Sequence, residues 1–103
     1  MELWSPLSKS QILTEIFLAE QNLDSVSEIL WNKIKISPQL WKCVDVIEDN
    51  FWVVAKSEQH IIWYNDIEEG FNISKYKIDG EIQNYNASKH ELQFVLEQLK
   101  SKL

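Results

Sequence analysis

The sequence predicts a single α+β domain with two N-terminal helices, a four- to five-stranded antiparallel meander, and a C-terminal helix packed on one face of the sheet. Two observations predict this order. Apolar residues recur at helical spacing at both ends of the chain, whereas between them they alternate with a period of two and are interrupted by turn residues. The 103 residues, of which 45% are hydrophobic, have the length and composition of one globular domain. We therefore assign residues 1–103 to one domain.

The first helix is expected to begin at Ser8. Ser8 and Gln11 have the S-x-x-Q spacing of a capping box, and Leu7 and Ile12 are placed to form a hydrophobic staple. Apolar residues then recur at helical spacing to about residue 22, which predicts one apolar face.

The second helix is expected to begin at Ser25, because Ser25 and Glu28 repeat the capping spacing. Ser37-Pro38 is expected to stop it, since the residue before a proline disfavours the helical region. Residues 37–41 then fit a single helical turn, with the proline in its tolerated first position.

Five strands are expected between the helices, over residues 42–48, 51–56, 60–65, 71–78 and 81–85. The second of them is apolar on both faces, which is typical of a central strand. Asp79-Gly80 is the strongest tight-hairpin signal in the chain, so the last two strands are expected to pair.

The final helix is expected to begin at Ser88, whose spacing to Glu91 forms another capping box. Its apolar stripe is made up of Leu92, Val95, Leu96, Leu99 and Leu103. Since the long connection leads to a helix rather than to a parallel strand, a nucleotide-binding βαβ fold is not expected.

The net charge of −6 is concentrated in the middle of the chain. Residues 45–81 contain nine acidic residues and three lysines, whereas the segments before and after them carry −1 and +1. An acidic chain with ten lysines and no arginine repels phosphate backbones and lacks the side chain that most often reads bases, which argues against nucleic-acid binding. A basic protein partner is the expectation that follows.

The chain shows no sign of export, membrane insertion or a bound cofactor. Its first residues lack the basic and apolar regions of a secretory signal, and no apolar run approaches the ~20 residues of a spanning helix. A single cysteine, Cys43, excludes an intramolecular disulfide, and neither glycine belongs to a phosphate-binding motif. These observations predict a cytoplasmic protein with no membrane association and no cofactor.

Catalytic and metal-binding residues are not predicted. Nothing in the sequence places a base near Cys43, which is expected to be a small buried residue. His60 and His90 lie far apart without ligand spacing, and both are expected to be solvated surface residues.

Asp66, Glu68 and Glu69 form the densest acidic cluster and precede Gly70. The simplest interpretation is a solvated turn in which the glycine supplies a positive φ angle. Paired carboxylates can also hold Mg²⁺ or act in general acid–base catalysis, although the segment lacks the alternation of a calcium loop. A third interpretation makes these acids part of a protein-binding face.

The five tryptophans allow two interpretations. Large rings are most simply explained as core residues, but exposed tryptophans flanked by polar residues are typical of binding hot spots. Trp52 and Trp63 fit neighbouring strands, where one of them could face outward.

Residues 51–55 (FWVVA), 63–72 (WYNDIEEGFN), 80–82 (GEI) and the closing helix resemble a group of small bacterial proteins, cyanobacterial ones among them, for which no activity is established. The likeness covers about half of the chain and implies a compact fold without an assigned activity. In composition the chain is also similar, more loosely, to bacterial immunity proteins that neutralise toxins.

The leading functional hypothesis is a non-enzymatic protein-binding module that presents an acidic and aromatic surface to a basic partner, with an immunity-type inhibitor as its most concrete form. The expected contact residues are Trp63, Tyr64, Asp66, Glu68 and Glu69. One alternative is a metal-dependent hydrolase that uses Asp66, Glu68 and Glu69. The other is a homo-oligomeric structural protein, in which outward tryptophans contact a second copy.

Overall fold

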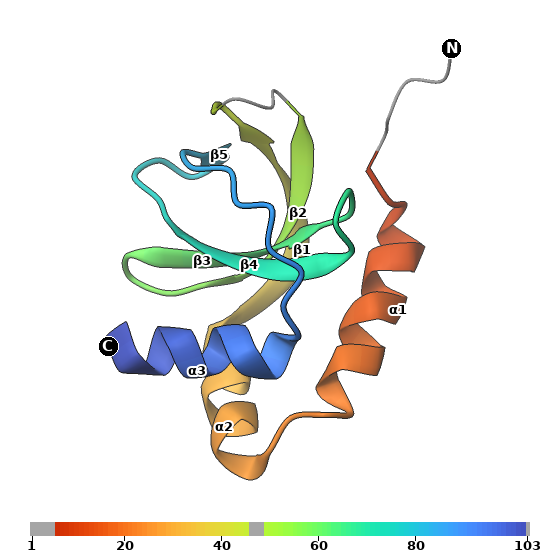
Figure 1. The fold of residues 1–103 in the computed structure, drawn as a ribbon, viewed down its shortest axis with the longest axis vertical. Helices are drawn as coiled ribbons and strands as arrows, with labels where there is room; N and C mark the ends of the chain where they lie inside the picture. Colours follow the sequence, from red (N-terminus) through yellow and green to blue (C-terminus); the bar gives the residue numbers. More distant parts are fainter. Residues whose placement is uncertain (1–5, 46–48, 103) are drawn as a thin grey trace.

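The computed structural model describes residues 6–45 and 49–102, and this part of the chain forms three helices and one five-stranded sheet (Figure 1). The elements are α1 (Lys9–Glu20), α2 (Ser25–Ile34), β1 (Lys35–Cys43), β2 (Asn50–Lys56), β3 (His60–Asn65), β4 (Gly70–Lys75), β5 (Glu81–Ile82) and α3 (Leu92–Lys102). The strand order is β4-β3-β2-β1-β5. The predicted α+β class is confirmed.

The start of α1 is the one the sequence predicts. Ser8 Oγ accepts a hydrogen bond from Gln11 N (3.1 Å), and Gln11 Oε1 accepts one from Ser8 N (2.8 Å), so both halves of the capping box are present. These bonds satisfy two of the backbone donors that a helix start leaves without partners.

The start of α2 differs from the prediction by one residue, because Asp24 rather than Ser25 is the N-cap. The Asp24 carboxylate accepts a hydrogen bond from Ser27 N (2.7 Å) and another from Gln93 Nε2 of α3 (2.9 Å). A carboxylate suits this position because it also interacts favourably with the positive end of the helix dipole.

The predicted helical turn at residues 37–41 is wrong, since these residues belong to β1. The chain passes directly from α2 into the strand at Lys35. Proline is tolerated here because the pairing of β1 with β2 is interrupted by a bulge between Lys35 and Gln39. The predicted strand over 42–48 therefore begins earlier, and its residues 46–48 lie outside the described residues.

The strands β2, β3 and β4 form the antiparallel meander that the sequence predicts. Their bounds match the predicted ranges to within one residue, except that β4 ends at Lys75 rather than at residue 78. Residues 51–55 of β2 are buried on both faces, as expected for a central strand.

The predicted last hairpin is wrong, because β5 does not pair with β4. Gly80 does adopt a positive φ of 98°, but the chain then continues to the opposite edge of the sheet. There β5 pairs in parallel with β1, with Lys42 opposite Glu81 and Cys43 opposite Ile82. The sheet is therefore mixed rather than a complete antiparallel meander.

The start of α3 also differs, since the helix begins at Leu92 and not after Ser88. Ser88 N donates instead to Asn72 Oδ1 of β4 (3.2 Å). The predicted apolar stripe is confirmed at its described positions, where Leu92, Val95, Leu96 and Leu99 are buried, and Leu103 lies outside the described residues.

The sheet separates two hydrophobic cores. The helix-side core consists of Ile12, Trp31, Trp52, Val54, Ala55, Ile62, Tyr64, Phe71, Leu92, Val95, Leu96 and Leu99. The strap-side core consists of Trp41, Cys43, Phe51, Val53, Ile61, Trp63 and Ile82, with Tyr76 and Tyr85 packed against it. All four described tryptophans are buried, which confirms the core interpretation for them, while Trp4 lies outside the described residues.

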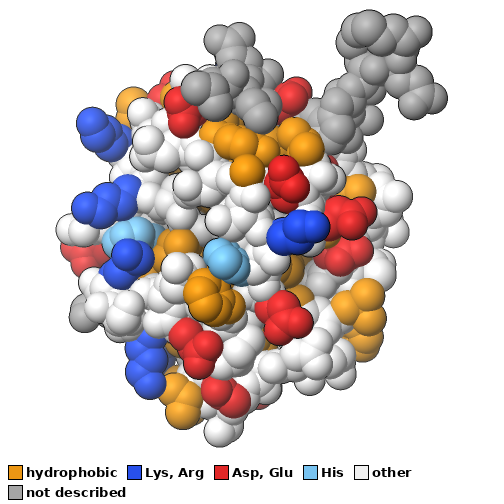
Figure 2. Space-filling model, viewed as in Figure 1, with side chains coloured by type: hydrophobic (Ala, Val, Ile, Leu, Met, Phe, Trp, Pro, Cys, Tyr) orange, Lys and Arg blue, Asp and Glu red, His pale blue; other side chains and the backbone are white. Residues whose placement is uncertain are grey.

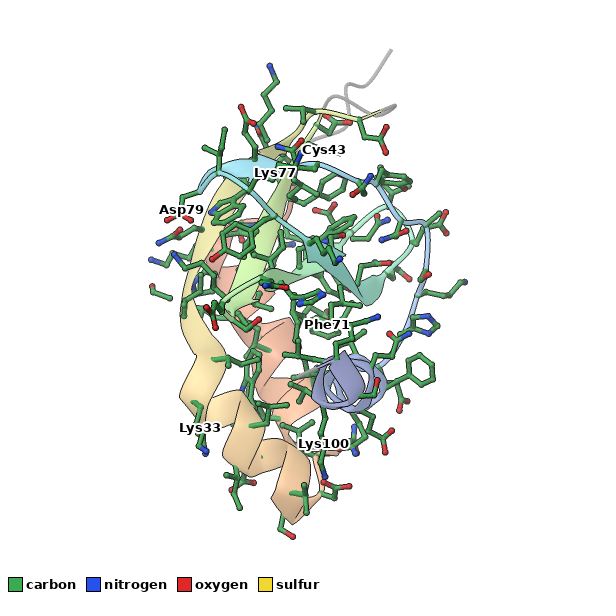
Figure 3. The ribbon with its side chains drawn as sticks, turned by 90° about the vertical axis from the view of Figure 1, so that its left-hand side faces the viewer. Lys33, Cys43, Phe71, Lys77, Asp79 and Lys100 are labelled. Carbon is green, nitrogen blue, oxygen red and sulfur yellow. The ribbon has the colours of Figure 1, made fainter. Side chains whose placement is uncertain are left out.

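The strap is the chain between β4 and α3, residues 76–91, and it covers the second core. Figure 1 shows it leaving β4, rising to β5 and returning as a coil to α3. In the side view of Figure 3, Phe71 lies next to α3, whereas Cys43 and Lys77 lie near the far end of the sheet. The α3 helix and the strap therefore cover opposite faces of the sheet.

Candidate functional site

A cleft of about 200 Å³ lies between α1, the β3–β4 turn and the start of α3. Its lining residues are Glu15, Leu18, Ala19, Asn22, Tyr64, Glu69, Gly70, Phe71, His90, Glu91, Leu92 and Gln93. Figure 2 shows the lysines mainly along the side of the molecule away from α1, whereas acidic side chains occur across this face, some of them beside α1. The cleft thus combines an apolar floor, formed by Leu18, Phe71 and Leu92, with an acidic rim, formed by Glu15, Glu69 and Glu91.

The β3–β4 turn that carries Glu69 is fixed from inside by Asn65. Asn65 Oδ1 accepts hydrogen bonds from Ile67 N (3.0 Å) and Glu68 N (3.2 Å), and its Nδ2 donates to Asn86 O in the strap (2.9 Å). Asparagine is suited to this arrangement because its side chain can bond to the backbone two residues later. The buried amide therefore sets the path of the turn.

Gly70 is needed for a close approach of the chain and not for a positive φ, which corrects the sequence interpretation. Glu69 is the turn residue with positive φ (60°). A Cβ atom on Gly70 would lie 2.0 Å from Lys89 Cα, and beside it Phe71 N donates to His90 O (2.9 Å). The glycine lets residues 89–90 lie against the sheet edge, which brings the start of α3 to the cleft.

The cleft has a negative electrostatic character. Burial raises the pKa of Tyr64 to about 12, and the carboxylates of Glu15, Glu69 and Asp66 contribute in the same direction. The two ion pairs among the described residues, Lys35–Glu20 and Lys56–Asp79, involve no acidic residue of the cleft. A cation in the cleft would therefore meet carboxylates that these ion pairs do not neutralise.

The structure separates Trp63 from Tyr64. Trp63 is 0% exposed in the strap-side core, where its Nε1 donates to Ser74 Oγ (3.0 Å). Tyr64 points to the other face of the sheet and, at 6% exposed, forms part of the cleft wall. Successive residues of a strand point to opposite faces, so the expectation that both aromatic rings contact a partner does not fit.

Asp66 holds the chain that leads into α1. Its Oδ2 accepts a hydrogen bond from Leu7 N (2.9 Å), and Trp52 Nε1 donates to Leu7 O (2.7 Å). Asp66 Oδ1 is buried and bonds to no described residue, and burial raises the pKa of this carboxyl group. Asp66 therefore has a structural position, in which it joins the segment before α1 to the β3–β4 turn.

The structure does not gather Asp66, Glu68 and Glu69 into a metal site. Among the described residues no group of three histidine, cysteine, aspartate or glutamate side chains is arranged to hold a metal ion. Of these three acids, Glu69 lines the cleft, whereas Asp66 and Glu68 do not.

The lone cysteine and the two histidines have different environments. Cys43 is fully buried and burial raises the pKa of its thiol, which confirms the expectation of a small buried residue. His60 is only 7% exposed, so the expectation of a solvated residue is wrong for it. His90 is half-buried on the cleft wall and stacks on Phe94, with ring centroids 4.3 Å apart.

Glu15 and Glu91 complete the acidic rim with Glu69, and no pattern in the sequence identifies them as site residues. Glu15 lies in the middle of α1, and Glu91 directly precedes α3. Neither belongs to a local motif with Glu69, because the three residues come together only through the packing of α1 and α3 against β4.

Comparisons with known proteins give no match, either to a protein-family model, to a curated protein or to a solved structure. In the part of the chain that the structure describes, no helix has the length and apolar character required to cross a bilayer.

Proposed function

We propose that this protein is a non-enzymatic protein-binding module whose cleft receives a lysine or arginine side chain of a basic protein partner. The observation that carries the proposal is the position of three carboxylates, those of Glu15, Glu69 and Glu91, around one cleft with an apolar floor. They come from α1, from the β3–β4 turn and from the segment before α3, so the fold itself brings them together.

The composition of the cleft matches the two parts of a long basic side chain. Lysine and arginine bury their methylene stems on apolar surface while keeping the charged group among polar atoms. In the cleft, Leu18, Phe71 and Leu92 offer the apolar surface, and the carboxylates offer the acceptors. A charge-assisted hydrogen bond to a carboxylate is stronger than a neutral one, which favours a cation over a polar uncharged group.

The charge of the whole chain supports the same kind of partner. A net charge of −6, with the excess of acids in residues 45–81, attracts a basic protein at long range and raises its association rate. In its most concrete form the module is an immunity-type inhibitor that covers a basic protein in the cytoplasm.

The first test is a two-dimensional NMR titration with a blocked tripeptide containing arginine, and with the same peptide containing citrulline. Citrulline keeps the shape of arginine and lacks its charge. We expect the arginine peptide to shift the backbone amide signals of Tyr64, Gly70 and Leu92, and the citrulline peptide to leave them unchanged. Equal shifts with both peptides would argue against a cation site.

The second test uses the triple variant Glu15→Gln, Glu69→Gln and Glu91→Gln. Its matched control changes the same number of charges outside the cleft, at Glu28, Glu58 and Glu97, which are exposed. We expect the cleft variant to lose the shifts and to lose capture of a basic protein from lysate at low salt. If both triple variants lose binding equally, the general charge and not the cleft would be responsible.

A further inference from the structure

The hydroxyl group of Tyr64 lies at the cleft without a hydrogen-bond partner. Tyr64 is 6% exposed and lines the cleft, and its Oη bonds to no described residue. The other two tyrosines differ, because Tyr76 Oη donates to Ser57 O (3.1 Å) and Tyr85 Oη accepts from Asn65 Nδ2 (3.0 Å). A largely buried polar group without a partner costs free energy, so native proteins keep few of them. The Tyr64 hydroxyl is therefore a group that a ligand in the cleft can satisfy.

The surroundings of this hydroxyl favour a cationic ligand. Burial and the carboxylates of Glu15 and Glu69 raise the pKa of Tyr64 to about 12, so the phenol keeps its proton and is uncharged at neutral pH. The oxygen of an uncharged hydroxyl accepts a hydrogen bond from an N–H donor. An anion at the same place would be repelled by the two carboxylates.

No cation of the chain itself is in position to bind there. None of the described residues that line the cleft is a lysine, and the sequence contains no arginine. Lys89 lies close by in the chain, but its side chain is exposed and is not part of the lining. The carboxylates and the hydroxyl are thus available to a cation that a partner supplies.

A guanidinium group matches these acceptors better than an ammonium group does. The acceptors stand on three different elements, with Glu15 on α1, Tyr64 on β3 and Glu69 in the β3–β4 turn. An arginine side chain carries several N–H donors in one rigid plane, whereas the donors of lysine all belong to a single nitrogen. The planar group can therefore bond at the same time to acceptors that lie on separate sides of the cleft.

The aromatic residues of the cleft favour the same group. The rings of Tyr64 and Phe71 pack edge to face, with centroids 5.0 Å apart and planes inclined by 66°. Figure 3 shows Phe71 next to α3, the helix whose start forms the far wall of the cleft. Guanidinium stacks on aromatic rings and is more weakly hydrated than ammonium, so its transfer from water into a partly apolar cleft costs less.

We propose that the cleft selects arginine over lysine, and that the Tyr64 hydroxyl determines this selectivity as an acceptor for the guanidinium group. This inference rests on the proposed function, because it names which of the two basic side chains the cleft receives. Glu15 and Glu69 supply the charge that attracts either side chain. Tyr64 adds an acceptor without adding charge, so its contribution depends on the geometry of the donors.

The test compares two blocked tripeptides that differ only in their central residue, arginine or lysine, in NMR titrations of the wild type and of Tyr64→Phe. We expect the wild type to bind the arginine peptide about tenfold more tightly, as for one hydrogen bond to a charged group. In Tyr64→Phe the dissociation constant of the arginine peptide should rise about tenfold, and that of the lysine peptide should change less. The matched control is Tyr76→Phe, which removes a hydroxyl outside the cleft and should keep the wild-type selectivity.

Thermal unfolding separates a recognition role of the hydroxyl from a structural one. Since the Tyr64 hydroxyl has no partner among the described residues, Tyr64→Phe should leave the unfolding temperature unchanged or raise it. Tyr76→Phe should lower it, because that hydroxyl donates to Ser57 O. A lower unfolding temperature in Tyr64→Phe would mean that the hydroxyl stabilises the free protein, which would contradict the proposal.

The two proposals fail in different ways. If the wild type binds both peptides equally, or if Tyr64→Phe keeps the wild-type selectivity, the inference about arginine is wrong and the proposed function is unaffected. If neither peptide shifts the amide signals of the cleft residues, the proposed function is wrong and the selectivity falls with it.

Discussion

The two faces of the sheet are covered in different ways. On one face, three helices contribute apolar side chains at regular spacing, and the cover is hydrophobic area. On the other face, the strap has almost no regular structure and is held by side-chain hydrogen bonds from Asn65, Asn72 and Ser74. The same sheet is therefore stabilised by apolar burial on one face and by apolar burial plus a polar seam on the other. The substitutions below test this difference.

The largest effect is expected from Trp63→Ala on the strap side. The ring is fully buried, its centroid lies 4.9 Å from that of Phe51, and its Nε1 donates to Ser74 Oγ. Removing a buried large aromatic side chain typically lowers the free energy of unfolding by about 3–5 kcal/mol, and urea denaturation measures this loss. Leu96→Ala, on the helix side, is the reference, with an expected loss of about 2–5 kcal/mol from apolar burial alone. If Trp63→Ala lowers the free energy of unfolding much less than Leu96→Ala does, the strap stabilises its face of the sheet less than the helices stabilise theirs.

A substitution at Asn72 separates the polar seam from the core beneath it. Asn72 is buried, donates to Ser88 O (2.9 Å) and accepts from Ser88 N (3.2 Å), which ties the strap to β4. Asn72→Leu keeps the volume and removes both bonds, so we expect a loss of about 1–3 kcal/mol in the free energy of unfolding. Hydrogen exchange at the Ser88 amide should accelerate more than exchange in α3. Equal acceleration in both places would contradict a local role for the seam.

On the helix side, the corrected helix cap gives a smaller and more local effect. Asp24→Ala removes the acceptor of Ser27 N and the partner of Gln93, and it should lower the unfolding temperature. Ser25→Ala tests the cap that the sequence predicts. It should leave the unfolding temperature nearly unchanged, because Ser25 is the first helical residue and not the cap. If Ser25→Ala lowered the unfolding temperature more than Asp24→Ala does, Ser25 would be the N-cap, as the sequence predicts.

The smallest effect is expected from the titration of His60. Burial lowers the pKa of His60 from its ordinary value of 6.5, and the charges of Lys102 and Lys75 act in the same direction. Below pH 6.5 the unfolded chain takes up a proton that the folded chain resists, so the free energy of unfolding should fall with pH down to the lowered pKa. Above pH 6.5 this contribution is complete. His60→Gln should flatten this part of the stability curve, measured between about pH 5 and pH 8. If the free energy of unfolding of His60→Gln varied with pH as steeply as that of the wild type, groups other than His60 would cause this dependence.

The helices and the three central strands could be predicted because their residues repeat with a regular period. The apolar stripe of α3, the capping box of α1 and the doubly buried β2 are examples in which the local pattern and the packing agree. An element can be predicted from the sequence where its local pattern and its tertiary packing favour the same structure.

The pairing of β5 could not be predicted, because a two-residue strand carries no period. The hairpin signal at Asp79-Gly80 is real as a turn, since Gly80 has a positive φ. The turn does not determine which strand β5 pairs with. That pairing is determined by the burial of Ile82 in the strap-side core next to Cys43. The helical turn predicted around Pro38 is wrong for a similar reason, because only the pairing of β1 with β2 shows that Pro38 lies in a bulge.

The candidate site could be predicted in part. Tyr64 and Glu69 were among the expected contact residues, and both line the cleft. The acidic partners from α1 and from the segment before α3 could not be found, because no local pattern links residues that far apart in the sequence. Trp63 was misplaced because β3 is apolar on both faces, which leaves no alternation to show which ring points to which side.

The parallel pairing of β5 with β1 also has a consequence for the order of folding. The strands β2 to β4 are joined by short connections and can pair early, whereas β5 must close a loop that contains most of the sheet. Until it does so, the rings of Trp41, Phe51 and Trp63 have no cover. A nascent chain that has not yet released its strap from the ribosome therefore exposes an aromatic sheet face, the kind of surface that aggregates and that chaperones bind.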